Sequence, residues 1–206
     1  MSSDNRNKSR MNRKQFVAGL AALGAMPGTV WAQAQPQQHE SHLVSDLKYT
    51  ADEITEAGAD FFGITTEVMA KGVQRIFGDL GQPDAYIKGD EGSGAFVVGV
   101  RYGSGFLIRK SREPQRVYWR GPSVGFDAGG NASKAFTLVY NLREDHRLFQ
   151  RFPGVEGSFY VVAGLGVNYM RSGGVTLAPI RTGVGLRAGV NAHYQVYSQS
   201  RDWFPL

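Results

Sequence analysis

Glycines and short apolar runs alternate along the second half of the chain, and this pattern most constrains the fold. Nineteen of the 27 glycines lie between positions 89 and 189. They separate runs rich in β-branched and aromatic residues, namely AFVVGVR, FLIRK, RVYWR, AFTLVY, SFYVVAGLGV, VTLAPIR and HYQVYS. Many short strands joined by tight turns are typical of small antiparallel barrels and sandwiches. The pattern therefore predicts a mainly β fold, a small soluble antiparallel β-barrel.

Individual glycines indicate where this barrel turns and bends. The sequence YGSG at positions 102–105 stands between two apolar runs and predicts a hairpin turn. Glycines inside the runs, such as Gly99, Gly164 and Gly166, predict sharp bends or close backbone approach at barrel corners.

Helical spacing is confined to two places. Thr50 stands three residues before Glu53, the spacing of a capping box, and apolar residues then recur at helical spacing to about Leu80. We expect an N-terminal helical segment over 50–80, broken in two near Gly63, that packs on the sheet. A second, short inserted helix is expected over 141–152, where Pro153 and Gly154 stop it.

The N-terminus has the pattern of an export signal. Five basic residues precede an apolar stretch from Phe16 to about Val30, and Ala32-Gln33-Ala34 forms a small-x-small cleavage site. We predict a signal peptide over 1–34, cleaved between Ala34 and Gln35, then a flexible polar linker over 35–49 and a single domain over 50–206. The predicted location is the periplasm; a retained membrane anchor is the alternative.

Net charge and cysteine content exclude several classes of function. The formal charge of +5 comes from 23 basic and 18 acidic residues, and cleavage removes five basic residues and one acidic residue, which leaves 18 − 17 = +1. Most of the basic excess thus lies in the signal, so we expect no nucleic-acid partner. The chain contains no cysteine, which excludes disulfides, thiol catalysis and thiolate metal sites. Most of the runs have five to seven residues, fewer than the strands of a membrane barrel need, so we expect no integral membrane protein.

The sequence GPSVG at 121–125 matches the G-x-S-x-G pattern of a serine-hydrolase nucleophile elbow. Such an elbow requires a strand before the serine and a helix directly after it. Here Gly129-Gly130 and the strand-like run AFTLVY follow. Asp145 and His193 come in the right chain order to complete a triad, but the alternating strands and helices of that fold are missing. We therefore expect Ser123 to be a strand residue, and predict no enzyme.

Other motif matches have equally simple explanations. GVGLRA at 183–188 matches a dinucleotide-binding pattern but lacks the strand–helix surroundings that pattern requires. Asp90 and Glu91 are interpreted as solvated acids on a glycine-rich turn. The remaining candidates are histidines: His39 and His42 in the linker form a weak metal site, and His146 is isolated. We predict neither a metal nor a cofactor.

One segment, VYWRGPSVGFDAGGN, combines aromatic and polar residues densely enough to suggest binding. Tyr118 and Trp119 are adjacent on a strand, so they point to opposite faces, and Trp119 is expected in the core. Asp127 and Asn131 are most simply turn residues. These four residues are our candidates for a ligand or partner site.

Four long blocks resemble the EipA family of periplasmic envelope-integrity proteins. The blocks are FFGITTEVMAKGVQRIFGDLGQPDAYIKGDEGSGAFVVGVRYGSG, VYWRGPSVGFDAGGNASKAFTLVYNL, QRFPGVEGSFYVVAGLGV and LAPIRTGVGLRAGVNAHY. The similarity extends from about Thr50 to Leu206. This resemblance implies a small β-barrel in the periplasm of a Gram-negative bacterium and a role in envelope homeostasis, with no known reaction. GPSVGFD is also distantly similar to SYLF-type domains, which bind lipids or actin.

Three functional hypotheses follow from these observations. The first is a non-enzymatic periplasmic protein that supports envelope integrity by binding a lipid, a polysaccharide or another periplasmic protein. The second is a periplasmic carrier or sensor of a lipid or other apolar ligand. The third is a hydrolase that uses Ser123. A barrel interior filled by large apolar side chains favours the first, and a cavity lined by small and polar residues favours the second.

Overall fold

The computed structural model describes residues 47–94, 98–124, 132–182 and 194–201. The chain divides into two units, 1–35 and 36–206, and all described residues lie in the second. The predicted signal peptide, its cleavage site at Ala34 and Gln35, and most of the linker therefore lie outside the described residues. No helix within the described ranges is long and apolar enough to cross a membrane.

Two helices open the second unit, as the sequence predicts. Helix α2 spans Ala51–Phe62, and its N-cap Thr50 forms the expected capping box with Glu53. It ends at Gly63, whose φ of 70° is in the left-handed region that glycine tolerates best. Helix α3 then spans Thr66–Leu80, with Thr65 as its N-cap.

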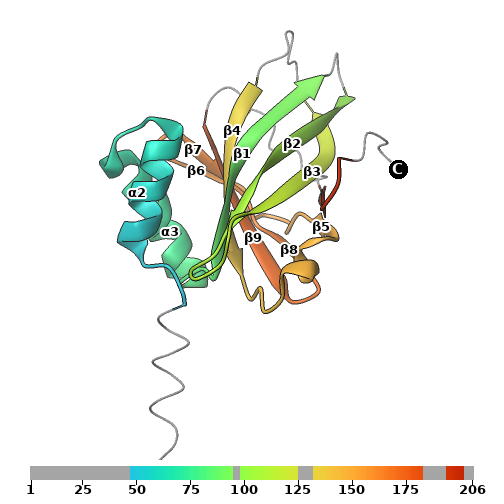
Figure 1. Ribbon diagram of the computed structural model, residues 1–206. Coiled ribbons are helices and arrows are strands. Elements are labelled where there is room, and N and C mark those ends of the chain that lie inside the picture. Colours follow the sequence, from blue (N-terminus) through green and yellow to red (C-terminus); the bar gives the residue numbers. More distant parts are fainter. Residues whose placement is uncertain (1–46, 95–97, 125–131, 183–193, 202–206) are drawn as a thin grey trace, which may run out of the picture. The chain divides into compact units, whose positions relative to one another are not determined.

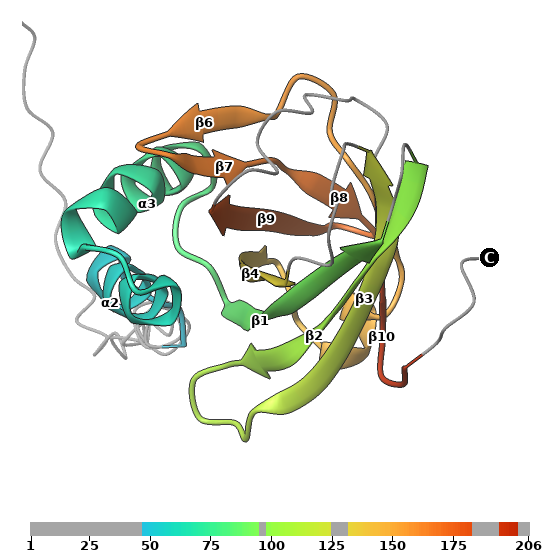
Figure 2. The same ribbon diagram turned by 90° about the horizontal axis from the view of Figure 1, so that it is seen from above.

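Ten strands form one antiparallel sheet that curls into a barrel (Figures 1 and 2). The sheet order is β5-β10-β3-β2-β1-β4-β9-β7-β6, and β8 pairs with β9 beside β7. The strands are β1 (Ala85–Gly94), β2 (Val98–Ile108), β3 (Gln115–Val124), β4 (Ala132–Tyr140), β5 (Arg151–Pro153), β6 (Tyr160–Val162), β7 (Leu165–Val167), β8 (Met170–Ser172), β9 (Val175–Thr182) and β10 (Tyr194–Ser198). An isolated bridge between Gly154 and Met170 connects the β5 end of the sheet to β8 and so closes the curl.

Glycine contacts explain why the strands are longer than predicted. The segment Tyr102–Gly105 is not a hairpin turn, because it lies inside β2 and pairs with both β1 and β3. Gly89 of β1 lies opposite Gly105 of β2, and a Cβ on Gly89 would be only 2.3 Å from the Ser104 carbonyl oxygen. These glycines permit close strand approach rather than chain reversal.

Strand length therefore does not distinguish this barrel from a membrane barrel, since β1 to β4 have 9 to 11 residues each. Charged side chains, namely Lys88, Asp90, Arg116 and Arg120, occupy the outer face of β1 and β3.

The predicted inserted helix is much shorter than expected. Only a 3-10 turn, η1 (Asp145–Leu148), lies between β4 and β5. The prediction of a helix over 141–152 is wrong at both ends, because Leu142 is anchored through its backbone N–H to Asp84 and Phe152 belongs to β5.

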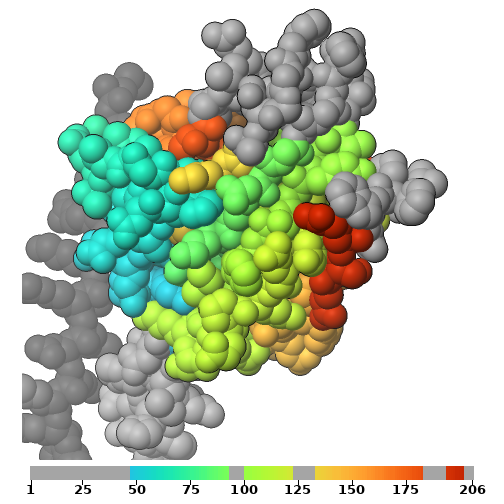
Figure 3. All heavy atoms as spheres, turned by 45° about the horizontal axis from the view of Figure 1, so that its top comes forward, coloured from blue at the N-terminus to red at the C-terminus, as the bar shows by residue number. Residues whose placement is uncertain are grey.

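Two apolar clusters lie on opposite sides of the sheet. The inner cluster lies inside the barrel, with Leu107, Val117, Leu148, Phe152 and Met170 all at most 2% exposed. The outer cluster joins the helices to the outer face of β4, β7 and β9, with fully buried residues such as Met69, Ile76, Phe136, Leu138 and Ile180. The expectation that the N-terminal helices pack on a β-barrel is therefore confirmed, and β2, β3 and β10 keep an outer face without a helical cover (Figures 2 and 3).

Candidate functional site: a buried carboxylate network and a pocket in the barrel wall

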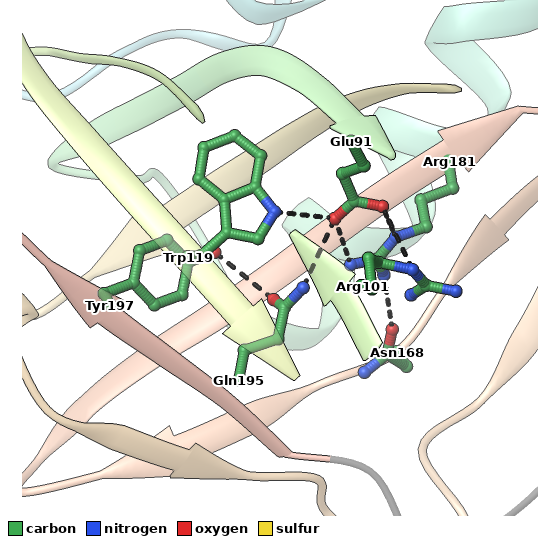
Figure 4. A network of polar contacts seen from close by, with 7 residues as sticks. All are labelled: Glu91, Arg101, Trp119, Asn168, Arg181, Gln195 and Tyr197. Carbon is green, nitrogen blue, oxygen red and sulfur yellow. Dashed lines mark hydrogen bonds and ion pairs between the residues drawn. The ribbon is translucent and has the colours of Figure 1, made fainter. Parts of the chain in front are cut away.

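A buried carboxylate lies at the centre of a network of polar contacts (Figure 4). The Glu91 side chain is 1% exposed. Its Oε1 accepts hydrogen bonds from Trp119 Nε1 at 2.8 Å, Arg181 Nη2 at 2.9 Å and Gln195 Nε2 at 3.3 Å, and its Oε2 accepts one from Arg181 Nε at 2.9 Å. Arg101 Nε lies 3.6 Å from Oε2. We call these five residues the Glu91 network.

The network holds Glu91 in its ionised form. Burial by itself raises the pKa of a carboxyl group, but the charge and hydrogen bonds of Arg181, the charge of Arg101 and the Trp119 hydrogen bond outweigh it and lower the pKa to about 2. Burial likewise opposes the charge on Arg181, and Glu91 reverses that effect and raises the Arg181 pKa. Glu91 is therefore a fixed negative charge at neutral pH and is poorly suited to act as a general acid or base there.

Further polar groups fix the orientation of the network. Arg181 Nη1 donates to Asn168 Oδ1 at 3.3 Å, and the Tyr197 hydroxyl donates to Gln195 Oε1 at 3.3 Å. The Tyr197 ring also packs against Trp119, with ring centroids 5.9 Å apart. Because these residues come from β3, β9, β10 and the chain after β7, the network joins strands that are distant in sequence.

Glu91 corrects a prediction from the sequence. We expected Asp90 and Glu91 to be solvated on a glycine turn, but both belong to β1, and only Asp90 is exposed. The missed signal is the two-residue period of Ala85, Ile87, Gly89 and Glu91, which places Glu91 on the inward face.

A pocket of about 230 Å³ opens in the wall formed by β1, β2, β3 and β10. It lies beside β2, β3 and β10, whose outer face has no helical cover. We call it the wall pocket, and its lining is Asp90, Glu91, Gly92, Tyr102, Gly103, Ser104, Tyr118, Trp119, Arg120, Ser198 and Arg201.

The wall pocket combines aromatic rings with charged and hydroxyl groups. Tyr102 and Arg120 are directly opposite each other on β2 and β3, as are Ser104 and Tyr118. The Arg116 guanidinium lies over the Tyr118 ring, 5.5 Å from its centroid. At the base, Gly103 leaves room for the indole of Trp119, because a Cβ at this position would be 2.1 Å from Trp119 Cε2.

Two of the four candidate binding residues line this pocket. Tyr118 is half-buried and Trp119 is 3% exposed, so the expected alternation holds and Trp119 lies in the core. Both contribute to the wall pocket. Asp127 and Asn131 lie outside the described residues, as do His39, His42, His193 and the segment 183–188.

Ser123 does not stand on a nucleophile elbow within the described chain. It belongs to β3 and pairs with Gly99 of β2. The Asp145 carboxylate, the acid that follows in the order of a triad, is instead bound by Arg109 at 2.5 Å and by Arg112 at 3.1 Å. Within residues 47–94, 98–124, 132–182 and 194–201, no group of three or more His, Cys, Asp or Glu side chains is arranged to hold a metal ion.

Comparison with known proteins identifies a family and a solved structure that resembles this chain. Residues 47–206 match the family described as Envelope integrity protein A (EipA). A crystal structure of a "beta-barrel-like, uncharacterized protein" from Brucella abortus is 45% identical, covers 77% of this chain and 99% of that one, and superposes with a TM-score of 0.71. No curated protein sequence matches the chain.

Proposed function

The chain belongs to the envelope integrity protein A family, and we propose that it supports the cell envelope as a non-enzymatic binding protein. The observation that carries this proposal is the wall pocket, which opens outside a barrel whose described interior is occupied by its own side chains. A filled barrel presents its outer surface to a partner.

The proposed site of action is the periplasm. The basic n-region, the apolar stretch and the Ala32-Gln33-Ala34 motif support export with cleavage between Ala34 and Gln35. The family match begins at residue 47, after the predicted signal and most of the linker, so the part shared with relatives is the part that we expect to remain after cleavage.

A carrier of a lipid within the barrel has less support. Leu107, Leu148, Phe152 and Met170 are at most 2% exposed and belong to the inner cluster. The Glu91 network shares Trp119 with this cluster and adds a buried ion pair. An acyl chain would have to displace both, and a buried charge that loses its partner is costly.

The chemistry of the wall pocket fits a saccharide chain of the envelope best. Tyr102 and Tyr118 offer aromatic rings, while Asp90, Ser104 and Arg120 offer hydrogen-bonding groups around them. Sites for polar organic ligands commonly combine such rings with a few placed polar groups. An apolar lipid tail would offer no hydrogen bonds to Asp90 and Ser104, which line the pocket.

Absence of catalysis is part of the proposal. Ser123 lies within a paired strand rather than on an exposed strand-to-helix turn, and the buried carboxylate is ionised and held by two arginines. Neither arrangement matches an activated nucleophile or a general acid.

Complementation of a strain that lacks the gene tests this function, with survival under detergent stress as the readout. We expect Tyr118→Ala and Arg120→Ala to lower survival at normal protein level, and the exposed Lys88→Ala on β1 to behave as wild type. Ser123→Ala is expected to complement fully. Loss of complementation by a folded Ser123→Ala protein would instead support the hydrolase.

Native mass spectrometry of residues 35–206 purified from the periplasm identifies the ligand class. Adducts spaced by hexose or N-acetylhexosamine masses, absent from Tyr118→Ala, would support saccharide binding at the wall pocket. A lipid-sized adduct would support the carrier instead, and wild-type survival with both pocket variants would contradict the pocket's role.

A further inference from the structure

A second hollow lies at the end of the barrel where β1 begins and β4 ends. It has a volume of about 620 Å³, within the range typical of small-molecule sites. We call it the basal groove, and its lining is Leu47, Lys48, Asp84, Arg109, Asn141, Leu142, Arg143, Arg147 and Gly174. These residues come from the chain before α2, the α3–β1 connection, the chain after β2, the β4–β5 connection and the β8–β9 turn.

The basal groove is strongly positive. Its lining has four cationic side chains and one carboxylate, which gives 4 − 1 = +3. Asp145 pairs with both Arg109 and Arg112. Counting Asp145 and Arg112 adds one negative and one positive charge, so the net charge stays +3. The nearby Glu144 carboxylate is exposed and is 3.1 Å from His146 Nδ1, and counting it leaves +2.

The carboxylates of the groove are already engaged by the fold. Asp84 Oδ2 accepts the backbone N–H of Leu142 at 2.8 Å, and Asp84 Oδ1 lies 3.6 Å from Lys48 Nζ. Asp145 is shared by Arg109 and Arg112. These acids fix the positions of the surrounding cations.

Hydrogen bonds to backbone carbonyls hold two of the arginines of the groove in place. Arg109 is 15% exposed, and its Nη2 donates to the Leu142 carbonyl at 2.8 Å. Arg147 Nη2 donates to the Gly173 carbonyl at 2.5 Å. Arg143 is exposed, and among the described residues its guanidinium has neither a hydrogen-bond nor an ion-pair partner. Because guanidinium groups match phosphate oxygens in shape and charge, such a set favours a phosphate over a diffuse anion.

We propose that the basal groove binds the phosphate group of an envelope constituent, with Arg143 and Arg147 as its main contacts. The phosphate is a monoester or diester, and it belongs either to the headgroup of an anionic lipid or to a soluble phosphorylated molecule. The groove is lined by residues entirely different from those of the wall pocket, so this inference is independent of the proposed saccharide site.

Binding to vesicles separates these two sources. Residues 35–206 are the appropriate protein, because the related crystal structure consists almost wholly of the matching domain and so indicates that it folds without the signal. The protein is sedimented with vesicles of phosphatidylcholine alone or mixed equally with phosphatidylglycerol, with and without glycerol 3-phosphate and inorganic phosphate as competitors.

We expect binding to the anionic vesicles, weakened about fivefold for each removed groove cation and so about 25-fold in Arg143→Gln/Arg147→Gln. The control pair Lys71→Gln/Lys88→Gln removes two charges from exposed positions outside the groove and should retain most of the binding. Arg143→Gln alone keeps the Arg147 bond to Gly173 and so avoids any effect on folding.

Displacement by the competitors would show that a free phosphate group suffices, and vesicle binding without displacement would assign the phosphate to the lipid surface. No binding to any phosphate probe, or an equal loss in the control pair, would overturn the proposal.

Discussion

At the scale of single residues, Glu91 matters most because its charge is buried and is balanced by two arginines. Four hydrogen bonds and an Arg101 contact converge on its carboxylate. Replacing a buried pair by apolar residues is often tolerated, whereas removing one partner is costly. The network thus specifies how β1, β3, β9 and β10 meet, and the integrity of the barrel depends on the ionisation of one side chain.

We expect the free energy of unfolding to fall in acid, because Glu91 becomes protonated there. Its pKa is about 2 in the folded protein against 4.5 ordinarily, so the stabilisation is present above pH 4.5 and is lost as the pH falls toward 2. The difference between these two pKa values corresponds to about 3 kcal/mol in the free energy of unfolding. Urea unfolding between pH 2.5 and 7 measures it.

Glu91→Gln is the matched variant for this measurement. We expect it to be less stable than wild type at pH 7 by about 3–5 kcal/mol, because Arg181 loses its counter-charge. The gap between the two proteins should narrow toward pH 2.5. A gap that stays constant with pH would contradict the ionised state of Glu91.

Gly103 provides a steric test at the same site. A methyl group there would lie 2.1 Å from the Trp119 indole, which its bond to Glu91 holds in place. We expect Gly103→Ala to lower the free energy of unfolding by about 1–3 kcal/mol. Gly92→Ala is the control, because a Cβ there has no neighbour within 4 Å; equal losses would show that backbone conformation, rather than Trp119, is responsible.

At the scale of elements, local signals predicted the helices well and the strands less well. The Thr50–Glu53 capping box and the break at Gly63 were correctly predicted, because caps and left-handed glycines act over a few residues. The turn predicted at 102–105 was wrong. Gly103 leaves room for the Trp119 indole and Gly105 permits close approach of β1, and both partners are distant in sequence. Partners this remote leave no local pattern.

In the candidate site, too, the local features were predicted and the contacts between residues distant in sequence were not. Trp119 was expected in the core and Tyr118 on the other face, since strand alternation is local. Burial of Glu91 depends on Arg181, 90 residues away, so the flanking glycines favoured a solvated turn instead. The basal groove likewise combines Lys48 with Arg143, and nothing in either segment indicates the other.

The capping box gives the prediction at this scale. Thr50 Oγ1 accepts the Glu53 N–H at 3.3 Å, and Glu53 Oε2 accepts the Thr50 N–H at 2.7 Å. We expect Thr50→Ala to reduce stability by about 1 kcal/mol. Thr66→Ala, at the first exposed position of α3, should change it little. The prediction fails if thermal or urea unfolding gives the two variants the same stability.

At the scale of the whole unit, one sheet carries a core on each face. The inner cluster fills the barrel, and the outer cluster attaches α2 and α3 to β4, β7 and β9. Neighbouring strand residues alternate between the two: Ala135 and Val139 belong to the inner cluster, Phe136 and Leu138 to the outer. Loss of either cluster removes support from the same strands, so the helices and the barrel should unfold together.

This coupling can be measured with two probes that report different layers. Trp119 fluorescence reports the barrel interior once Trp31 and Trp203 are replaced by Phe, and circular dichroism at 222 nm reports mainly the helices. We expect both signals to give one urea midpoint. Ile76→Ala, which opens a cavity in the outer cluster, should cost about 2–5 kcal/mol and shift both midpoints equally. If the helical signal were lost first in this variant while Trp119 stayed buried, the helices would form a unit that unfolds separately from the barrel.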